Sequence, residues 1–458
     1  MKIKRDIYQK IVDWKEECNG SKALLIEGAR RIGKSTIVEE IGKNEYKSYI
    51  LIDFNKANKN IKNAFDDLNN LDVFFQKLSL EYNTKLYKRN SLIIFDEIQK
   101  FPKAREAIKY LVLDGRYDYI ETGSLISIKE NVFNITIPSE ERKIQMYPVN
   151  FKEYMYYMDE EILYKYIEEC YLQNKPLENT YHLKAMRLFK EYVLVGGMPQ
   201  VLVAYKENNK NFELADVEKR DILNLYRDDI NKASKKYNSK VSALFENIPA
   251  YLSTHEKRII LSEIENDGRF SKYDEPLFWL GDSMICNLCY KCNDPNVGLS
   301  LNINESFVKC YFADTGLLVS LTFNENELAT QELYKQIMND RLSINEGMLY
   351  ENAISQMLVS MNKKLYFYTR NNIEKHRNDI EIDFIISNES KTKYKISPIE
   401  VKSSKNYSQT SLDRFAQLFS KRIDKKIIVH PKNFSISNGI IRIPPYMLII
   451  MLQEKYDE

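Results

Sequence analysis

The sequence predicts an α/β protein of several domains, with parallel strands near the N-terminus and a second α/β core near the C-terminus. Three observations predict this class. The apolar run Ala23–Ile26 precedes the glycine-bearing stretch Gly28–Ser35, a later apolar run ends in two acids at 96–97, and two further strand-like runs occupy 380–386 and 397–403. Strand-like runs separated by helical patterns are typical of parallel sheets covered by helices.

Length and composition limit the class of protein. The chain has 458 residues, which suits about three domains rather than one core. It is 44% hydrophobic and 29% charged, as in folded rather than disordered proteins. The formal net charge is only +2, so binding to nucleic acid would depend on local patches.

The sequence also bears on location. No apolar run approaches the ~18 residues that a membrane helix needs, and Tyr446–Leu452 is expected to be a short core segment. The start, Met1–Asp6, has no apolar signal region behind it. We therefore expect a cytoplasmic protein without membrane contact, whose six cysteines stay reduced.

Gly28–Ser35 fits the phosphate-binding pattern G-x-x-x-x-G-K-[ST]. A strand before this loop and a helix from Lys34 onward would direct backbone N–H groups and the positive helix end at a triphosphate. Lys34 would reach the β- and γ-phosphates, and the Ser35 hydroxyl would bind Mg²⁺. The predicted nucleotide-binding residues of this segment are Gly28, Arg31, Gly33, Lys34, Ser35 and Thr36.

The run Ser91–Glu97 predicts a buried strand with carboxylates at its C-terminal edge. Ligands bind at that edge in open α/β sheets. Asp96 would hold Mg²⁺, while Glu97 would orient and polarise the attacking water.

Further strands are expected at 48–54 and 117–124. A helix is expected over 105–113, between the strand that ends in the two acids and the strand at 117–124. The second of these strands ends in small polar residues, of which Thr122 or Ser124 could sense the γ-phosphate. Thr-Gly-Ser is also an ordinary turn.

These segments resemble a prokaryotic family of AAA-type ATPases of the AAA+ superfamily. The resemblance spans nearly the whole chain and is carried by Gly28–Ser35, Leu92–Glu97, Thr122–Ser124, Arg142 with Tyr147–Tyr154, Val195–Pro199 and Leu225–Ile230. It implies an AAA-type P-loop domain over 1–150, ATP and Mg²⁺ as cofactors, and a C-terminal domain of unknown function with a restriction-endonuclease-like core.

In that family an arginine precedes the Tyr-Pro segment, and Arg142 occupies this place. The sequence leaves three roles open for Arg142: contact with nucleotide in its own subunit, contact in a neighbouring subunit, and a structural role.

The middle of the chain is expected to be helical and then mixed. Residues 151–237 show helical periodicity and predict a lid on the nucleotide domain, with Gly196–Pro199 as a helix-ending turn. Residues 238–325 predict a winged helix, with helices at 255–266 and 273–285 before strands at 288–292 and 307–312. Such modules bind DNA or dock proteins, and the sequence leaves both open.

Cys286, Cys289 and Cys292 form C-x-x-C-x-x-C, a spacing that metal sites also use. A zinc site or a [4Fe–4S] cluster normally takes four ligands, and Cys310 is the only nearby fourth candidate. We therefore interpret the three cysteines as buried thiols.

The region 326–458 contains a second set of charged residues. Its two strands carry Asp383, Glu400 and Lys402, and a helix at 345–352 carries Glu351. This layout resembles a PD-(D/E)XK nuclease, in which Asp383 and Glu400, supported by Glu351, would hold Mg²⁺ and Lys402 would orient or deprotonate the attacking water. A charged strand edge and a nuclease-like fold that binds DNA without cutting it remain alternatives.

Local charge agrees with a nucleic-acid partner, because residues 391–426 hold ten basic and three acidic residues, a net +7. The sequence predicts a protein that binds and hydrolyses ATP and acts on DNA, with a Mg²⁺-dependent nuclease as the finer hypothesis. The alternatives are a nucleotide-controlled DNA- or protein-binding module that does not cleave, and an ATP switch that recruits another protein. Self-association into a homo-oligomer is left open.

Overall fold

The structure of the chain is a computed structural model. It describes residues 2–66, 68–125, 138–233, 237–254, 257, 259, 273–323, 329–339, 341, 345–372, 377–389 and 394–453. The chain divides into two compact units. The N-terminal unit comprises Lys4–Tyr147 with Asp282–Met284, and the C-terminal unit comprises Met1–Ile3, Pro148–Gly281 and Ile285–Glu458.

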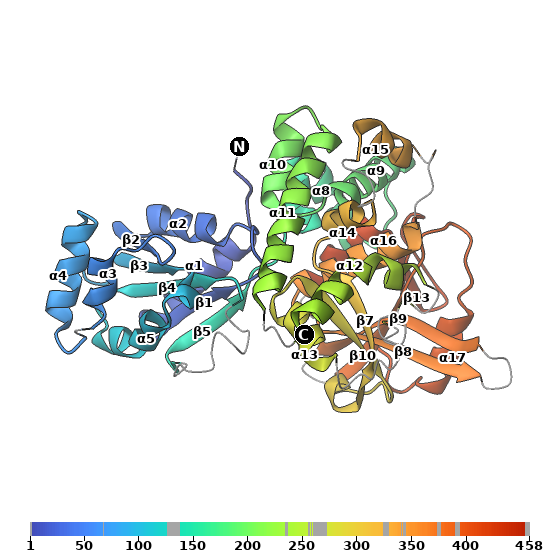
Figure 1. Cartoon of the computed structure of the whole chain (residues 1–458). Coiled ribbons are helices and arrows are strands. Elements are labelled where there is room, and N and C mark those ends of the chain that lie inside the picture. Colours follow the sequence, from blue (N-terminus) through green and yellow to red (C-terminus); the bar gives the residue numbers. More distant parts are fainter. Residues whose placement is uncertain are drawn as a thin grey trace. The chain divides into compact units, whose positions relative to one another are not determined.

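The N-terminal unit is a parallel five-stranded sheet with the strand order β2-β3-β4-β1-β5 and helices on both faces (Figure 1). The strands predicted from the apolar runs are confirmed. The elements are α1 (Ile7–Cys18), β1 (Ala23–Glu27), α2 (Lys34–Glu45), β2 (Ser48–Asp53), α3 (Lys59–Ala64), α4 (Leu71–Glu81), β3 (Ser91–Asp96), η1 (Ile98–Lys100), α5 (Pro102–Asp114), β4 (Asp118–Gly123) and β5 (Glu141–Gln145).

An aromatic core fixes α3, α4 and α5 on one face of this sheet. The rings of Phe54 and Phe95 lie 5.9 Å apart, and Phe65 lies 5.7 Å from Phe95. Burying each such ring contributes roughly 1.5–3 kcal/mol. Because helices cover both faces, β3 is buried along its whole length, which explains its unbroken apolar pattern.

The C-terminal unit contains an eight-stranded mixed sheet with the order β12-β13-β11-β10-β9-β8-β6-β7. Its strands are β6 (Cys286–Cys292), β7 (Ile303–Phe312), β8 (Leu365–Asn372), β9 (Arg377–Glu389), β10 (Tyr394–Val401), β11 (Lys426–Val429), β12 (Ser435–Ser437) and β13 (Ile440–Ile443). Its helices are α7 (Phe151–Tyr157), α8 (Glu161–Leu172), α9 (Asn179–Val195), α10 (Pro199–Glu207), α11 (Phe212–Lys232), α12 (Asn238–Ser253), α13 (Asp274–Asp282), η4 (Leu299–Asn302), α14 (Thr315–Thr322), α15 (Gln331–Met338), α16 (Glu346–Ser360), α17 (Thr410–Leu418), η5 (Pro445–Met447) and α18 (Leu448–Gln453).

The two strands expected to form the wing of a separate module belong to this large sheet. β6 pairs with β7 in antiparallel fashion and with β8 in parallel fashion, where Cys289 is opposite Leu365. The helix expected over 273–285 is α13, whereas nearly all of the helix expected over 255–266 lies outside the described residues. The winged helix and the proposed domain boundaries stay predictions.

The helices expected to form a lid share a core with the C-terminal part of the chain. His182 Nδ1 on α9 lies 2.8 Å from Tyr446 OH on η5. Gln356 on α16 donates to Tyr192 OH on α9 at 3.0 Å. These buried polar contacts hold α9 within the C-terminal unit, and packing of a lid on the nucleotide domain stays a prediction.

The helix-ending turn predicted at 196–199 is confirmed, and it is a point of close backbone contact. Gly196 has φ +87° at the end of α9, and Asp314 accepts a hydrogen bond from Gly197 N at 2.5 Å. A Cβ on Gly316 would lie 2.2 Å from Val195 O. The start of α14 therefore fits against the end of α9 only because Gly196 and Gly316 lack side chains.

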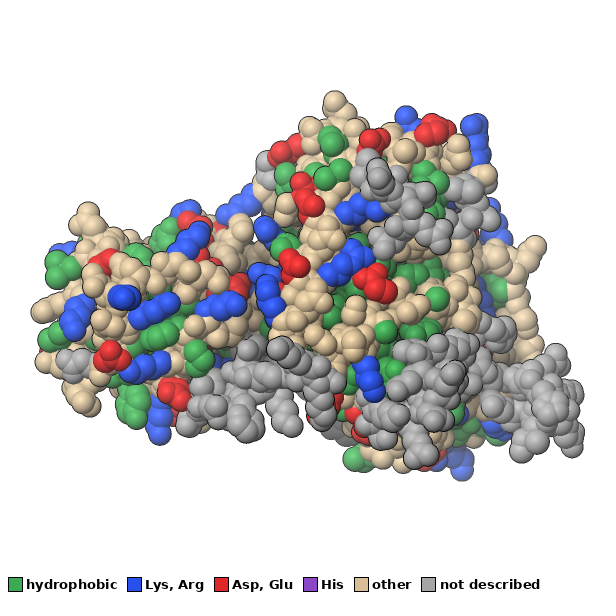
Figure 2. All heavy atoms as spheres, in the orientation of Figure 1, with side chains coloured by type: hydrophobic (Ala, Val, Ile, Leu, Met, Phe, Trp, Pro, Cys, Tyr) green, Lys and Arg blue, Asp and Glu red, His purple; other side chains and the backbone are tan. Residues whose placement is uncertain are grey.

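No helix among the described residues is long and apolar enough to cross a membrane. On the face that Figure 2 shows, Lys and Arg side chains are scattered with Asp and Glu side chains among them, which agrees with the small net charge.

We expect Gly316→Ala to destabilise the C-terminal unit by about 3 kcal/mol, because the methyl group would meet a backbone carbonyl that cannot move freely. Urea unfolding in a Trp14→Phe background, followed by Trp279 fluorescence, would report on this unit alone, since these are the two tryptophans of the chain. Gly347→Ala is the control, because a Cβ added at Gly347 would lie 3.5 Å from its nearest neighbour, Asn345 Oδ1, which is an ordinary contact distance. Equal midpoints for the two variants would contradict the packing argument.

Candidate functional site

The loop between β1 and α2 has a backbone that few side chains permit. Gly33 has φ +94° and Arg31 has φ +66°. A Cβ on Gly28 would lie 2.5 Å from Met146 O. α2 begins at Lys34, so its N-terminal N–H groups and positive dipole end adjoin the loop. The loop therefore has the shape and polarity that bind phosphate.

The side chain of Lys34 lies across this loop. It is buried, and Nζ donates to Gly28 O at 2.8 Å and Ala29 O at 2.7 Å. Burial lowers the pKa of Lys34 to about 8, opposed in part by Glu97 and Asp96. The ammonium is thus held where it would meet the β- and γ-phosphates of a bound nucleotide.

Three oxygen-bearing side chains meet at the carboxyl edge of the sheet. Ser35 Oγ donates to Asp96 Oδ1 at 3.0 Å, and Thr122 Oγ1 donates to the same oxygen. β4 lies between β1 and β3, which brings Thr122 beside Asp96. Hydroxyl and carboxylate oxygens are the ligands that Mg²⁺ prefers, so this set fits the predicted ion. Thr36 is exposed next to Ser35, and Ser124 is buried just beyond β4.

Glu97 follows β3 in a left-handed conformation with φ +55°. Gln99 donates to Glu97 Oε2 at 2.6 Å and fixes the carboxylate. A non-glycine residue in this conformation costs about 1 kcal/mol or more, and such strain concentrates at functional sites. The sequence did not single out Gln99.

Arg142 does not lie at the phosphate end of the sheet in its own chain. It is on β5 opposite Leu24, three residues before Glu27 ends β1, which is about 10 Å at the usual strand rise. Its guanidinium donates to Glu17 on α1 at 2.6 Å. Contact with a nucleotide of a neighbouring subunit stays a prediction.

Arg5, which precedes α1, contacts the phosphate loop and was missed by sequence reasoning. It donates to Ile32 O at 2.9 Å and to Tyr147 O at 2.6 Å. These contacts tie the phosphate loop to the segment after β5. No local pattern could have found them, because the partners are 27 and 142 residues away.

In the C-terminal unit, Asp383, Glu400 and Lys402 lie together at the end of β10. Asp383 Oδ2 accepts a hydrogen bond from Val401 N at 2.8 Å, and Lys402 Nζ lies 3.0 Å from Glu400 Oε2. Burial and the nearby Glu351 raise the pKa of Asp383 to about 7. Burial also raises the pKa of Glu400, against the opposing effect of Lys402.

Lys402 keeps its proton. Burial alone would lower its pKa, but Glu400 and Asp383 outweigh that effect and raise the pKa above its usual value. Of the two roles the sequence offered for Lys402, orientation of water by a cation fits this environment and deprotonation of water does not.

Glu351, on α16, has a different environment from Asp383 and Glu400. Its Oε2 accepts a hydrogen bond from Tyr311 OH at 3.0 Å, and its Oε1 pairs with Lys257. Lys309 Nζ lies 4.0 Å from the same carboxylate. Although burial works the other way, the two lysines lower the pKa of Glu351. Glu351 is thus already neutralised by protein cations.

The predicted metal ligands do not form a closed set. In the part of the chain that the structure describes, no three His, Cys, Asp or Glu side chains are grouped so that they could hold a metal ion. Asp383 and Glu400 offer oxygen donors that suit Mg²⁺. Glu351 does not fit as a ligand, because its oxygens are engaged by Tyr311 and Lys257.

The cysteine triplet is buried, and all six cysteines are free thiols. Cys286, Cys289 and Cys292 lie on one strand, β6. Side chains alternate between the faces of a strand, so Cys289 faces away from the other two, and six residues separate Cys286 from Cys292 by about 20 Å. The three thiols cannot converge on one ion.

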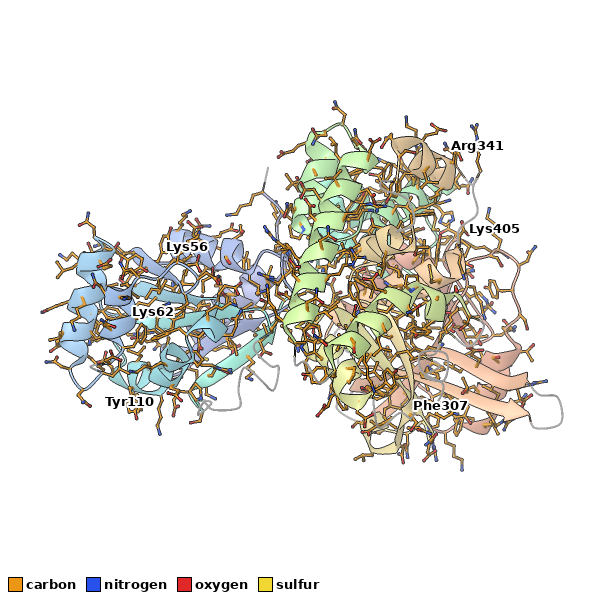
Figure 3. The ribbon with its side chains drawn as sticks, viewed as in Figure 1. Lys56, Lys62, Tyr110, Phe307, Arg341 and Lys405 are labelled. Atoms are coloured by element: carbon orange, nitrogen blue, oxygen red, sulfur yellow. The ribbon has the colours of Figure 1, made fainter. Side chains whose placement is uncertain are left out.

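The basic segment at 391–426 is partly neutralised. Arg414 pairs with Asp379, and Arg422 pairs with Asp294, two acids outside the segment. Lys405 is exposed and projects from the ribbon in Figure 3. Lys402 keeps positive charge close to Asp383 and Glu400.

Residues 20–155 match the family model described as an AAA domain. This part of the chain is an AAA domain. The predicted AAA-type P-loop ATPase is thereby confirmed for the N-terminal unit, and nucleotide binding follows from the family. Residues 186–328 match a domain of unknown function, DUF8612, and residues 346–447 match another, DUF4143. Neither description tests the nuclease-like core. No curated protein matches the chain.

Among solved structures, the chain is similar to Cdc6p from Pyrobaculum aerophilum, with 10% identity over 74% of this chain and 94% of that chain and a TM-score of 0.30. The ORC1 protein of Aeropyrum pernix, solved in complex with DNA, shows 9% identity over 69% and 91% of the chains and a TM-score of 0.28. A signal-transduction ATPase with numerous domains from Pyrococcus horikoshii shows 11% identity over 76% and 45%, with a TM-score of 0.24. Likenesses at these TM-scores carry no argument about function.

We expect Arg142→Ala to leave the affinity of the AAA domain for ATP within about twofold, because the exposed pair with Glu17 is far from the loop and weak. Lys34→Ala, the positive control, should weaken binding at least about tenfold by removing a charge-assisted contact to phosphate. Titration with a fluorescent ATP analogue at low protein concentration measures both. A tenfold loss in Arg142→Ala would place this residue at the nucleotide of its own chain.

Proposed function

We propose that this protein hydrolyses ATP in its AAA domain and acts on DNA through its C-terminal unit, where Asp383, Glu400 and Lys402 cleave a phosphodiester with the help of Mg²⁺. The observation that carries the proposal is the meeting of these three side chains at one strand end. Two carboxylates and a cation are the groups that phosphodiester hydrolysis requires.

In the AAA domain the residues divide the work. Loop N–H groups and Lys34 bind the phosphates, and Ser35 and Asp96 would hold the Mg²⁺ that neutralises charge between them. Glu97, held in place by Gln99, is the carboxylate available to orient water. Thr122 donates a hydrogen bond to Asp96 and so links β4 to the same edge of the sheet. The proposal thus assigns catalysis to Glu97 and positioning to Gln99.

In the C-terminal unit, Asp383 and Glu400 would hold one Mg²⁺, which would polarise the phosphoryl oxygen. Lys402 is charged and partly exposed, so it can bind the scissile phosphate and orient water beside Glu400. The exposed Lys405 adds attraction for the backbone of nucleic acid.

A second candidate is a nucleotide-controlled module that binds DNA or a protein without cleaving. The neutralisation of Glu351 by Lys257 and Lys309 favours it, because one of the three predicted ligands is not available. Fold similarity to a nuclease does not by itself imply cleavage.

We expect Glu97→Gln to bind ATP normally and to lose at least about 100-fold in kcat, because the amide cannot polarise water. Glu39→Gln, the same change on the outer side of α2, is the matched control. Phosphate release and nucleotide titration on the same preparations separate turnover from binding. Unchanged hydrolysis in Glu97→Gln would remove Glu97 from its role.

We expect supercoiled plasmid or single-stranded DNA to be cut in Mg²⁺ or Mn²⁺ by the wild type, with a loss of at least about 100-fold in Glu400→Ala and in Lys402→Ala. Glu332→Ala and Lys335→Ala are the matched controls, because they make the same substitutions on α15, away from the site, and should cleave like the wild type. EDTA should stop the reaction. Equal cleavage by wild type and site variants would exclude this nuclease, and DNA binding without cleavage would select the second candidate.

A further inference from the structure

We propose that Lys309 is a built-in cation of the C-terminal site: its ammonium takes the place beside Glu351 that a divalent cation would take, so the site binds at most one divalent cation, at Asp383 and Glu400. The inference rests on the proposed function and states how many metal ions that function can use.

Lys309 is completely buried on β7, and its Nζ has no hydrogen-bond partner within the part of the chain that is described. It lies 3.8 Å from Glu381 Oε1 and 4.0 Å from Glu351 Oε2, above the ring of Phe367 at 5.0 Å. A buried ammonium is costly unless anions surround it. The polar neighbours of this ammonium group are carboxylates and not backbone carbonyls. A metal ion bound at this place would have the same carboxylates as neighbours.

The length of its side chain lets Lys309 reach the site from β7. In a flat sheet, β7 would be three strand spacings, or about 14 Å, from β9. The long side chains of Lys309 and of Glu381 on β9 bridge this distance, since Lys309 Nζ lies 3.8 Å from Glu381 Oε1. A strand that the sequence assigned to a different module thus supplies a charge to the nuclease-like core.

Glu351 is committed to lysine instead of metal. Tyr311 donates to one of its oxygens, and Lys257 pairs with the other. The residues that stand in the way of a metal ion at Glu351 are therefore protein groups with fixed positions. The carboxylates left for an exchangeable cation are Asp383 and Glu400.

Charge limits the site in the same way. The four carboxylates Glu351, Glu381, Asp383 and Glu400 face the three lysines Lys257, Lys309 and Lys402, which leaves one formal negative charge. One divalent cation would make the set positive by one, and a second would make it positive by three. Like charges at a few ångströms in a buried site repel strongly, so a second ion is disfavoured.

The experiment counts bound Mn²⁺ in the full chain without nucleotide or DNA, by calorimetry and by electron paramagnetic resonance. All variants, the parent included, carry Asp96→Asn, so that the AAA domain does not contribute its own ion, and Lys257→Met, so that Lys309 is the cation that remains beside Glu351. We expect Lys309→Met to bind one more Mn²⁺ per chain than the parent, and Lys309→Arg to bind the same number as the parent. Lys335→Met, the same change at an exposed lysine of α15, is the matched control and should not alter the count.

An unchanged count in folded Lys309→Met, or two ions in the C-terminal unit of the parent, would overturn the inference. If Lys309→Met does not fold, Glu351→Gln in the parent decides: the inference expects the count to stay the same, and loss of an ion would overturn it. Cleavage of DNA is measured separately, so a protein that binds metal as expected but does not cut would refute the nuclease and leave the role of Lys309 intact.

Discussion

Ser35 Oγ and Asp96 Oδ1 are 3.0 Å apart although 61 residues separate them in the sequence. This contact depends on the parallel order of the sheet, in which β4 lies between β1 and β3 and brings Thr122 level with Ile26. A slip of one residue in any of these strands would turn its side chains to the opposite face. The phosphate loop, the acid and the hydroxyl therefore form one site only because the apolar core holds three strands in a single register.

The same dependence on register applies in the C-terminal unit, with a different balance of charge. Asp383 reaches the backbone of β10 at Val401, so β9 and β10 bring their charged residues to one point. The AAA domain has one buried lysine that faces the space for phosphate, whereas the C-terminal site surrounds its carboxylates with lysines. The AAA domain can therefore bind anions such as phosphate. In the C-terminal site, lysine side chains already balance much of the negative charge of the carboxylates.

Local patterns were sufficient wherever a residue's role is set by its neighbours in the chain. The loop at Gly28–Ser35, the acids at 96–97 and the strand carrying Asp383 could all be predicted from spacing and apolar runs, because these features report burial and backbone shape. Partners across the sheet could not. Apolar periodicity shows that β6 is buried but not that it pairs with β8, whose Leu365 lies opposite Cys289. Lys309 lies in the strand expected at 307–312, and only its contacts in the folded chain show that it faces Glu351 and Glu381.

A lysine in the position of a metal ion changes what the site can do before any ligand arrives. Its charge is always present, so Glu351 is neutralised during folding and does not need a metal ion to be buried, and the partly exposed Glu381 also has a cation beside it. The fold can therefore be stable without metal, which would not hold for a site whose carboxylates all required one. This makes the C-terminal unit compatible with both a nuclease and a non-cleaving binding module. What separates the two is confined to Asp383 and Glu400, because these carboxylates of the site are not committed to Lys257 or Lys309, and burial raises the pKa of both.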